Sequence, residues 1–425
     1  MPNRTVHAGG GRVENATVFS PALGVEKRFN IYLPPGYEEG TERYPVLYLF
    51  RGHEKEWFDP YQDHSRGGTA VQHLADELIH SGAIGPMIIV GASTTSDDGS
   101  VFGLGVDFLN PRRTRERGGV GTGRFEQYVV EDLIGHVDRA YRTIPDGEAR
   151  GADGFSLGGF TAVMLAVKHP GLFGSVGCYD GSFMFRNLVD PRLQSGAPDD
   201  PLWVRADDLF AAAFRRPRAR RYDIDYMLGY NPLNIVERLS DRERAVLEKT
   251  RFYIHSASSD GRQGNRDRCV HLASLFLYMG IPNEVKSLIL SSDAMHTWRF
   301  ADLHLRLTLR RHSRAFGLTP VQATPEESEA PLGPIDVVEV RSWEGWREDP
   351  EVTFHAYASG PLKVDIYNRF GEYITCMLHE EMSAGRHQRQ WNGRNHQGNP
   401  VPSGVYYLQF SGHWGSRRHK FIYLK

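Results

Sequence analysis

The sequence is poor in cysteine, has almost no net charge and contains no long apolar run. Its 425 residues include only three cysteines, Cys178, Cys269 and Cys376, and these lack the spacing of metal ligands or of a disulfide framework. The formal net charge of −2 excludes the strong basic field typical of proteins that bind nucleic acid. No stretch is long enough to cross a bilayer. We therefore expect no metal, no nucleic-acid partner and no membrane span.

The first residues also lack the apolar core of a signal peptide. From this stretch alone we expect either a cytoplasmic protein or a secreted one whose leader is not part of this sequence.

Apolar runs alternate with helical patterns over most of the chain. Residues 44–50, 86–90, 174–179, 251–255 and 284–291 are typical of strands buried on both faces. Helical periodicity follows several of them, as at 70–81 and 298–316, and residues 12–34 alternate like two antiparallel strands. Strands alternating with helices predict an α/β fold with a mostly parallel sheet and helices on both faces.

Changes in this rhythm suggest how the chain is divided. We expect an enzymatic domain over residues 1–316, in which residues 91–123 form a loop over a binding face and residues 183–245 form a cap-like insertion. Within the insertion, the basic run 215–221 is interpreted as a solvated face, with an anion-recognition patch as the alternative. Residues 317–335 contain four prolines and indicate a linker. Residues 336–425 change to a period of two, which predicts a β-sandwich.

A serine lies between glycines at one point of this pattern, in Gly154-Phe155-Ser156-Leu157-Gly158-Gly159. The spacing is that of a nucleophile elbow, a sharp strand-to-helix turn that exposes a serine hydroxyl above the sheet. The glycines are needed because a side chain at those positions would collide with neighbouring backbone. Ser156 is therefore the predicted nucleophile.

A serine nucleophile needs a base and an acid that orients the base, in loops at the carboxyl ends of later strands. His296 follows the last buried strand and is the predicted base; His255, His271 and His304 are rivals, with His255 interpreted as a core residue. Asp260, in the polar turn after the strand at 251–255, is the predicted acid. Asp267 and Asp293 are the alternatives.

Position alone suggests the remaining site residues. Backbone amides of Leu157 and of the loop around Gly52 and His53 would form an oxyanion hole. Trp57 and Trp298 flank the site in sequence and could form an aromatic wall for the substrate, although they could equally be core residues.

These motifs, in this order, resemble the esterase D family of α/β-hydrolases, which includes feruloyl and acetylxylan esterases, S-formylglutathione hydrolases and bacterial mycolyltransferases. The resemblance covers residues 12–316. It rests on Asn30 to Tyr37, the elbow, His169 to Phe173, the Ser-Asp-Gly turn at 259–261, and His296-Thr297-Trp298. It implies an α/β-hydrolase fold with Ser156, Asp260 and His296 as triad.

Two positions depart from the family pattern. Arg51 stands before Gly52 where the family usually has histidine, so that Arg51 becomes a candidate substrate contact, and Asp180-Gly181 stands where Ser-Gly is usual. The tail, including Trp391 to Arg394 and Val401 to Tyr407, resembles the immunoglobulin-like domain of flagellar hook-capping proteins. That resemblance implies a non-catalytic module and favours a location outside the cell, with cell-surface or polysaccharide contact.

The sequence thus predicts a serine carboxylesterase that acts without a cofactor on a small or carbohydrate-linked ester. Acyl transfer to an alcohol through the same acyl-enzyme is one alternative. A catalytically silent glycan-binding or adhesion protein is another, and an aromatic surface at Trp343, Trp346 or Trp414 would be typical of a polysaccharide-binding sandwich.

Overall fold

The computed structural model describes residues 4–6, 10–66, 68–184, 209–257, 265, 268–269, 272–273, 276, 279–281, 289–291, 295–318, 335–341, 351–356, 359–368, 371–383, 385–412 and 415–423. Two compact units are present. The first contains Met1–Leu288 and Ala294–Ser328, and the second contains Glu329–Lys425 together with Ile289–Asp293. Strand β9 (Ile289–Ser291) is the last strand of the sheet in the first unit.

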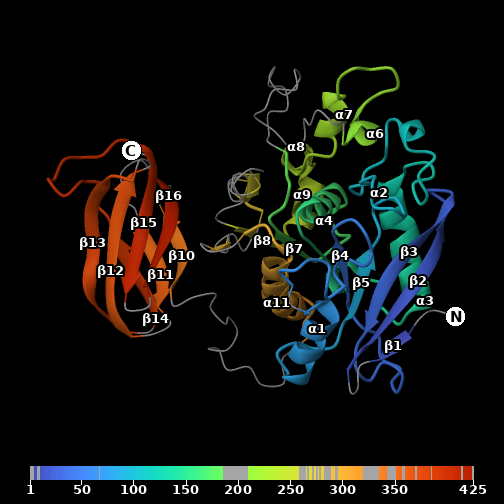
Figure 1. The fold of residues 1–425 in the computed structure, drawn as a ribbon, viewed down its shortest axis with the longest axis horizontal. Helices are drawn as coiled ribbons and strands as arrows, with labels where there is room; N and C mark the ends of the chain where they lie inside the picture. Colours follow the sequence, from blue (N-terminus) through green and yellow to red (C-terminus); the bar gives the residue numbers. More distant parts are fainter. Residues whose placement is uncertain are drawn as a thin grey trace. The chain divides into compact units, whose positions relative to one another are not determined.

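A nine-stranded sheet forms the centre of the first unit, in the order β1-β2-β3-β5-β4-β6-β7-β8-β9 (Figure 1). Strands β1 (Arg4–Val6), β2 (Arg12–Ser20) and β3 (Val25–Leu33) are antiparallel to their neighbours. Strands β4 (Val46–Phe50), β5 (Ile88–Ala92), β6 (Arg150–Gly154), β7 (Ser175–Tyr179) and β8 (Arg251–Ala257) pair in parallel. The mostly parallel sheet predicted from the buried runs is confirmed.

Helices cover both faces of this sheet because both faces are apolar. Helices α1 (Val71–His80) and α11 (Trp298–Ala315) pack one face through a hydrophobic cluster that includes Leu74 and Leu305. On the other face, α3 (Ile134–Ala140), α4 (Leu157–Lys168) and α8 (Pro232–Arg238) pack through a larger cluster. Every residue of α4 from Leu157 to Val167 is buried, as expected for a helix at the centre of an α/β fold.

Near-helical apolar spacing in the sequence predicts a helix over residues 124–143, and this helix is not uniform. It consists of α2 (Phe125–Gln127), a π-helical turn η2 (Tyr128–Leu133) and α3. The apolar spacing from Phe125 to Tyr141 was only near-helical, and a wider turn brings Tyr128, Val129 and Leu133 onto the buried side.

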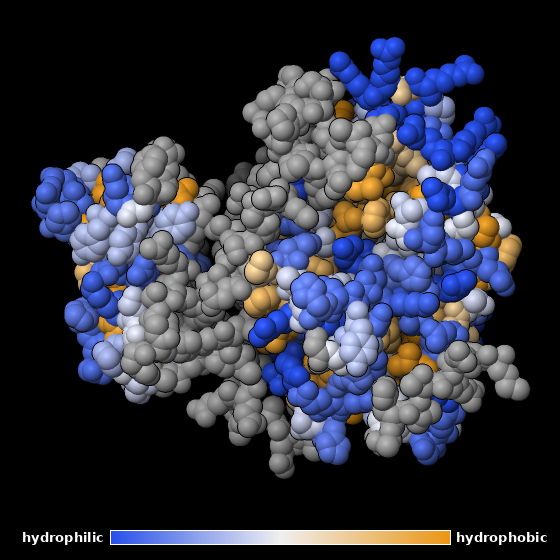
Figure 2. All heavy atoms as spheres, in the orientation of Figure 1, coloured by the Kyte–Doolittle hydropathy of each residue, from blue (hydrophilic) through white to orange (hydrophobic). Residues whose placement is uncertain are grey.

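The remaining elements of the first unit are short. They are η1 (Pro111–Arg113) in the loop after β5, η3 (Gly147–Ala149) before β6, and α6 (Ala211–Phe214), α7 (Ile224–Leu228) and α9 (Asp241–Leu247) in the described part of the 183–245 segment. Of the basic run, residues 216–221 are exposed, and Figure 2 shows hydrophilic side chains standing out there, between α6 and α7. This exposure agrees with the interpretation of the run as a solvated face.

The second unit consists of antiparallel strands in two sheets. One sheet has the order β10-β11-β14 and the other β13-β12-β15-β16. The strands are β10 (Ile335–Arg341), β11 (Glu351–Ala356), β12 (Gly360–Asn368), β13 (Tyr373–Met382), β14 (Gly385–Gln390), β15 (Gly404–Gly412) and β16 (Gly415–Tyr423). Side chains from both sheets share one core, for example Phe354 with Phe410. Trp343, Trp346 and Trp414 lie outside the described residues.

Candidate active site

Adjacent parallel strands bring the candidate residues to one edge of the sheet. Phe50 at the end of β4 lies beside Gly154 at the end of β6, and Tyr179 at the end of β7 lies beside His255 of β8. Arg51, Phe155, Asp180 and Ser256 therefore begin or border neighbouring loops at the carboxyl ends of the strands. In open α/β sheets this edge is where ligands bind.

The elbow has the geometry that its glycines predict. Ser156 has φ 59° and ψ −119°, between β6 and α4, a conformation that costs a non-glycine residue about 1–3 kcal/mol. A Cβ atom at Gly158 would lie 1.9 Å from the carbonyl oxygen of Phe50, and one at Gly154 would lie 2.2 Å from that of Gly158. Backbone packs where these side chains would be, so the turn tolerates only glycine.

Gly158→Ala is expected to destabilise the fold by at least about 2–3 kcal/mol and to abolish activity, because the added methyl group overpacks the β4–α4 contact. Gly135→Ala in α3 is the matched control. Its Cβ would meet only the end of the Arg139 side chain, at 3.1 Å, and alanine in a helix should add about 0.5–1 kcal/mol. Urea unfolding of both variants measures the contrast; equal stabilities would contradict the packing argument.

A continuous chain of hydrogen bonds joins Ser156, His296 and Asp180. The Nε2 atom of His296 lies 3.0 Å from Ser156 Oγ, and its Nδ1 atom lies 2.8 Å from Asp180 Oδ2. In the tautomer that carries its proton on Nδ1, the ring donates to Asp180 and accepts from the serine hydroxyl. The His296 side chain is 19% exposed, whereas that of Asp180 is completely buried.

The Asp180 carboxylate is held by further donors. Its Oδ1 atom accepts from Ser256 Oγ at 2.6 Å and from the Ala257 backbone N–H at 2.9 Å. Asp180 has φ 49°, in the left-handed region that aspartate tolerates better than most residues. Both carboxylate oxygens are thus occupied and the group is fixed in orientation.

The predicted acid, Asp260, lies outside the described residues, as do Asp267, Asp293 and His271. The structure places the carboxylate of Asp180 on His296, a residue that the sequence analysis named only as a departure from the family pattern. Its position directly after the buried strand β7 was the available signal. His255 and His304, the other rivals of His296, are buried core residues.

An aromatic and polar layer supports the triad from behind. The ring of Phe155 lies 4.6 Å from that of His296, and Tyr179 stacks on Phe155 while its hydroxyl donates to the carbonyl of Met295 at 3.0 Å. These contacts fix the position of Met295, which precedes His296, and cover one face of the His296 ring.

Deeper in the core, the buried carboxylate of Asp153 hydrogen-bonds to His304, Thr308 and His312. Burial alone would raise the pKa of Asp153, but His304 and His312 hold it well below the usual range. The segment that leads into the elbow is therefore tied to α11 through a buried ionised group.

The predicted oxyanion donors come from two segments, the first turn of α4 and the loop after β4. Leu157 is the first residue of α4, where a backbone N–H has no partner within the helix. Gly52 follows β4 by two residues, and its carbonyl accepts a 2.7 Å hydrogen bond from the Thr94 N–H. Because a peptide unit is planar, this bond fixes the orientation of the Gly52–His53 peptide. We call residues 51–53 the oxyanion loop.

Trp57 and Trp298 do not form an aromatic wall, and this corrects the expectation that they bind substrate. Their exposed fractions are 1% and 6%, their rings meet edge-on at 5.0 Å, and the Trp57 indole donates to the carbonyl of Phe50. The two tryptophans are core residues that support the loop after β4.

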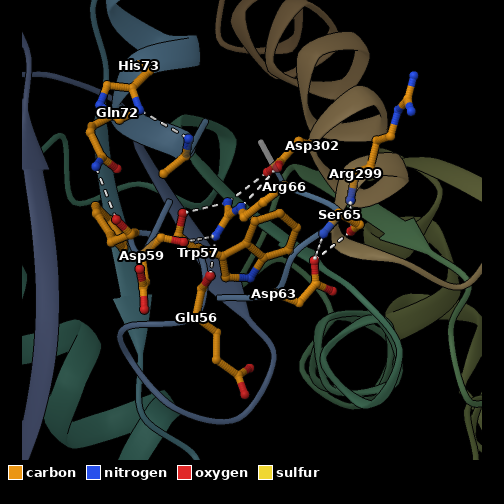
Figure 3. A network of polar contacts seen from close by, with 12 residues as sticks. Glu56, Trp57, Asp59, Asp63, Ser65, Arg66, Gln72, His73, Arg299 and Asp302 are labelled. Carbon is orange, nitrogen blue, oxygen red and sulfur yellow. Dashed lines mark hydrogen bonds and ion pairs between the residues drawn. The ribbon is translucent and has the colours of Figure 1, made fainter. Parts of the chain in front are cut away.

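Arg66 connects this loop to α11, as Figure 3 shows. Its guanidinium forms a two-point ion pair with Asp302 at 2.7 and 2.9 Å. It also donates to the backbone carbonyls of Glu56, Trp57 and Asp59, so all five N–H groups have acceptors. The guanidinium carbon lies 4.7 Å from the ring centre of Trp298. Burial raises the pKa of Asp302, and Arg66 opposes this shift.

Arg66→Met is expected to lower the free energy of unfolding by about 3–5 kcal/mol, since it leaves Asp302 as an unpaired buried charge. Urea unfolding measures this loss. The control is Arg299→Met on the exposed side of α11, which should change stability by less than about 0.5 kcal/mol. Similar losses in the two variants would contradict the role given to Arg66.

Arg51 lies at the rim of the site. Its guanidinium carbon lies 5.4 Å from the ring centre of Phe155, and its Nε atom is buried without a hydrogen-bond partner among the described residues. Burial raises the pKa of Glu56 in the same loop, against the opposing charge of Arg51. Arg51 is thus a cation beside Phe155 of the elbow, with one donor that has no partner among the described residues.

Neither a metal site nor a membrane-spanning helix is found among the described residues. Among the described residues, no group of three or more His, Cys, Asp or Glu side chains is arranged to hold a metal ion. None of the described helices combines the length and the apolar character that crossing a membrane requires.

Comparison with known families matches residues 20–264, more than half of the chain, to the Esterase family, described as "Putative esterase". The chain belongs to the Esterase family. Residues 348–415 match the FlgD Ig-like domain, in agreement with the β-sandwich. The esterase-family resemblance, the α/β-hydrolase fold and the immunoglobulin-like tail predicted from the sequence are all confirmed.

Two relatives of this Esterase-family chain have esterase names. It is 31% identical over 193 residues to an endo-1,4-beta-xylanase/feruloyl esterase of Xylanibacter ruminicola, covering 43% of this chain and 23% of the relative. It is 29% identical over 170 residues to an esterase of Mycobacterium tuberculosis, covering 39% and 31%. The chain thus spans less than a third of the length of these two relatives.

Solved structures confirm the fold. A ferulic acid esterase superposes with a TM-score of 0.52 at 19% identity, over 72% of this chain and 98% of that structure. An S-formylglutathione hydrolase from Agrobacterium tumefaciens has the same TM-score and identity, over 74% and 99%.

Proposed function

We propose that the chain is a serine carboxylesterase whose triad is Ser156, His296 and Asp180. The observation that carries this proposal is the pair of hydrogen bonds from Ser156 Oγ to His296 Nε2 and from His296 Nδ1 to Asp180 Oδ2. A serine in a strained elbow, a base in contact with it and an acid that orients the base are what acyl transfer to serine requires. Membership of the Esterase family supports the same chemistry.

In this mechanism His296 removes the proton from Ser156 as the oxygen attacks the ester carbonyl. Asp180 keeps the imidazole in the correct tautomer and stabilises the imidazolium. The oxyanion of the tetrahedral intermediate is stabilised by the Leu157 N–H and an amide of the oxyanion loop. The proton then passes from His296 to the leaving alcohol. Water, activated by the same histidine, cleaves the acyl-enzyme and restores Ser156.

The substrate class we propose is a small or carbohydrate-linked ester, with Arg51 contacting the part that lies over Phe155. The relative named a xylanase/feruloyl esterase supports the inclusion of a feruloyl ester among the substrates tested. Acyl transfer would proceed through the same acyl-enzyme, with a sugar hydroxyl in place of water.

The test is a burst experiment with p-nitrophenyl esters from acetate to longer chains, and with methyl ferulate for substrate choice. We expect one equivalent of p-nitrophenol per chain before steady turnover, and phosphorylation of Ser156 alone by an organophosphate, mapped by mass spectrometry. If the enzyme also transfers acyl groups to alcohols, a reaction with added glycerol should yield a glyceryl ester. A folded chain that neither turns over any ester nor labels at Ser156 would exclude the esterase and leave glycan binding as the alternative.

For the division of the chain, we propose that residues 1–316 act as the esterase domain, 317–335 as a linker and 336–425 as a non-catalytic sandwich. Contact of this sandwich with polysaccharide or a cell surface is tested by sedimenting the intact chain with insoluble xylan. Recovery of all the chain in the supernatant would argue against polysaccharide contact.

A further inference from the structure

Lys27 is a lysine buried beside the oxyanion loop. It lies on β3 with 0% of its surface exposed, and its ammonium group donates a 2.6 Å hydrogen bond to the carbonyl of Thr95. A buried cation is costly unless nearby groups compensate for its lost hydration. The mechanism above assigns no role to this side chain.

The segment that Lys27 holds is the one that orients the oxyanion loop. Thr94 donates its backbone N–H to the carbonyl of Gly52, and the carbonyl of the following residue, Thr95, accepts from Lys27. A Cβ atom at Gly52 would lie 3.0 Å from the Thr95 Cγ2 atom, so this segment and the oxyanion loop are in close contact. A shift of Thr95 is therefore transmitted to the Gly52–His53 peptide.

Charges around Lys27 come from both neighbouring loops. Glu54, which is 3% exposed, lies after β4 and Asp97 after β5; both favour the ammonium form, while Arg28 on β3 opposes it. The ring centre of Phe125 lies 5.7 Å from the ammonium nitrogen. Glu54 also pairs with His53 of the oxyanion loop at 3.0 Å. Loss of the positive charge on Lys27 would thus weaken its hold on both loops.

We propose that Lys27 is a positioning residue for the oxyanion hole, which holds the Thr94–Thr95 segment and the oxyanion loop in the catalytic arrangement only while it is protonated. This inference rests on the proposed esterase function. Lys27 touches neither the substrate nor the reacting atoms, but the rate of catalysis depends on the charge of its side chain.

Burial lowers the pKa of Lys27 from its usual 10.5 to about 8. Esterase activity is therefore expected to fall as pH rises through about 8. Stability is expected to change in the opposite direction. Between pH 8 and 10.5 the unfolded chain binds more protons at this lysine than the folded chain does, so its contribution to folding stability rises with pH. Unfolding cannot then explain the loss of activity.

The experiment compares the pH profiles of kcat and KM on p-nitrophenyl acetate for the full chain and for Lys27→Met. At pH 7 the Met variant should lose about 10- to 100-fold in kcat with little change in KM, because a small displacement of catalytic groups has effects of this size. The alkaline fall near pH 8 should disappear. The substitution removes a buried cation, which favours folding, but it also removes the donor to the Thr95 carbonyl, which opposes it. Urea unfolding at pH 7 verifies that the variant is folded under the assay conditions.

Two further variants sharpen the result. Lys27→Arg keeps the charge at all accessible pH values, so it should retain activity above pH 8 where the natural chain loses it. Lys249→Met, at an exposed lysine, should keep the natural profile. A Met variant with unchanged kcat at pH 7, or one that still loses activity near pH 8, overturns the inference while leaving the esterase proposal intact. Absence of esterase activity in the natural chain at every pH overturns both.

Discussion

Asp180→Asn is expected to lower kcat about 10⁴-fold, which corresponds to about 5.5 kcal/mol of transition-state stabilisation. The amide can still accept from Ser256 and Ala257 through its oxygen, so the loop is retained. Its NH₂ group, however, now faces His296 Nδ1 and donates a hydrogen bond to it, so that this nitrogen must accept a hydrogen bond instead of donating one. The imidazole is then in the wrong tautomer to take the Ser156 proton. Steady-state kinetics on a p-nitrophenyl ester measure the loss.

Asp260→Asn is the matched control for this prediction. If Asp180 is the acid, the Asp260 variant should keep kcat within a few-fold of the natural chain. The reverse pattern, a large loss for Asp260→Asn and a small one for Asp180→Asn, would return the role to the residue that the sequence favoured. Urea unfolding of both variants separates a catalytic loss from a folding defect.

The sequence led to Asp260 because the family resemblance and the order of serine, acid and histidine both pointed to a loop after a later strand. Both Asp180 and Asp260 follow a buried strand, so strand order alone cannot choose between their loops. The choice depends on side-chain direction at the sheet edge. The left-handed backbone of Asp180 and the donors Ser256 and Ala257 turn its carboxylate toward His296.

Ser156 and the elbow were predictable for a different reason. The tight turn imposes a local requirement for Gly154 and Gly158, and a local requirement is visible in sequence. The role of Trp57 depends instead on its distant partner Trp298, which no spacing reveals. The burial of Lys27 is likewise not visible in the sequence. In the strand pattern Lys27 is one of the alternating polar residues, and the loops after β4 and β5 are what bury it.

Ser156→Ala is expected to have the largest effect of any single substitution, a fall in kcat of about 10⁶-fold, because without the hydroxyl no acyl-enzyme forms. A residual rate about 10³–10⁴ above the uncatalysed reaction should remain, because the oxyanion hole and substrate binding are retained. The burst of p-nitrophenol should vanish. The free energy of unfolding should not fall, because replacing the Ser156 hydroxyl removes no packing contact of the core.

Ser182→Ala is the control for this variant. The hydroxyl of Ser182 lies 3.4 Å from that of Ser156, at the upper limit of a hydrogen bond, and its loss should lower kcat less than about 10-fold. Because Ser182 is the nearest other hydroxyl that the structure places at the elbow, a double variant of Ser156 and Ser182 should be no less active than Ser156→Ala alone. A burst that survives in Ser156→Ala and disappears in the double variant would instead identify Ser182 as a nucleophile and contradict the triad.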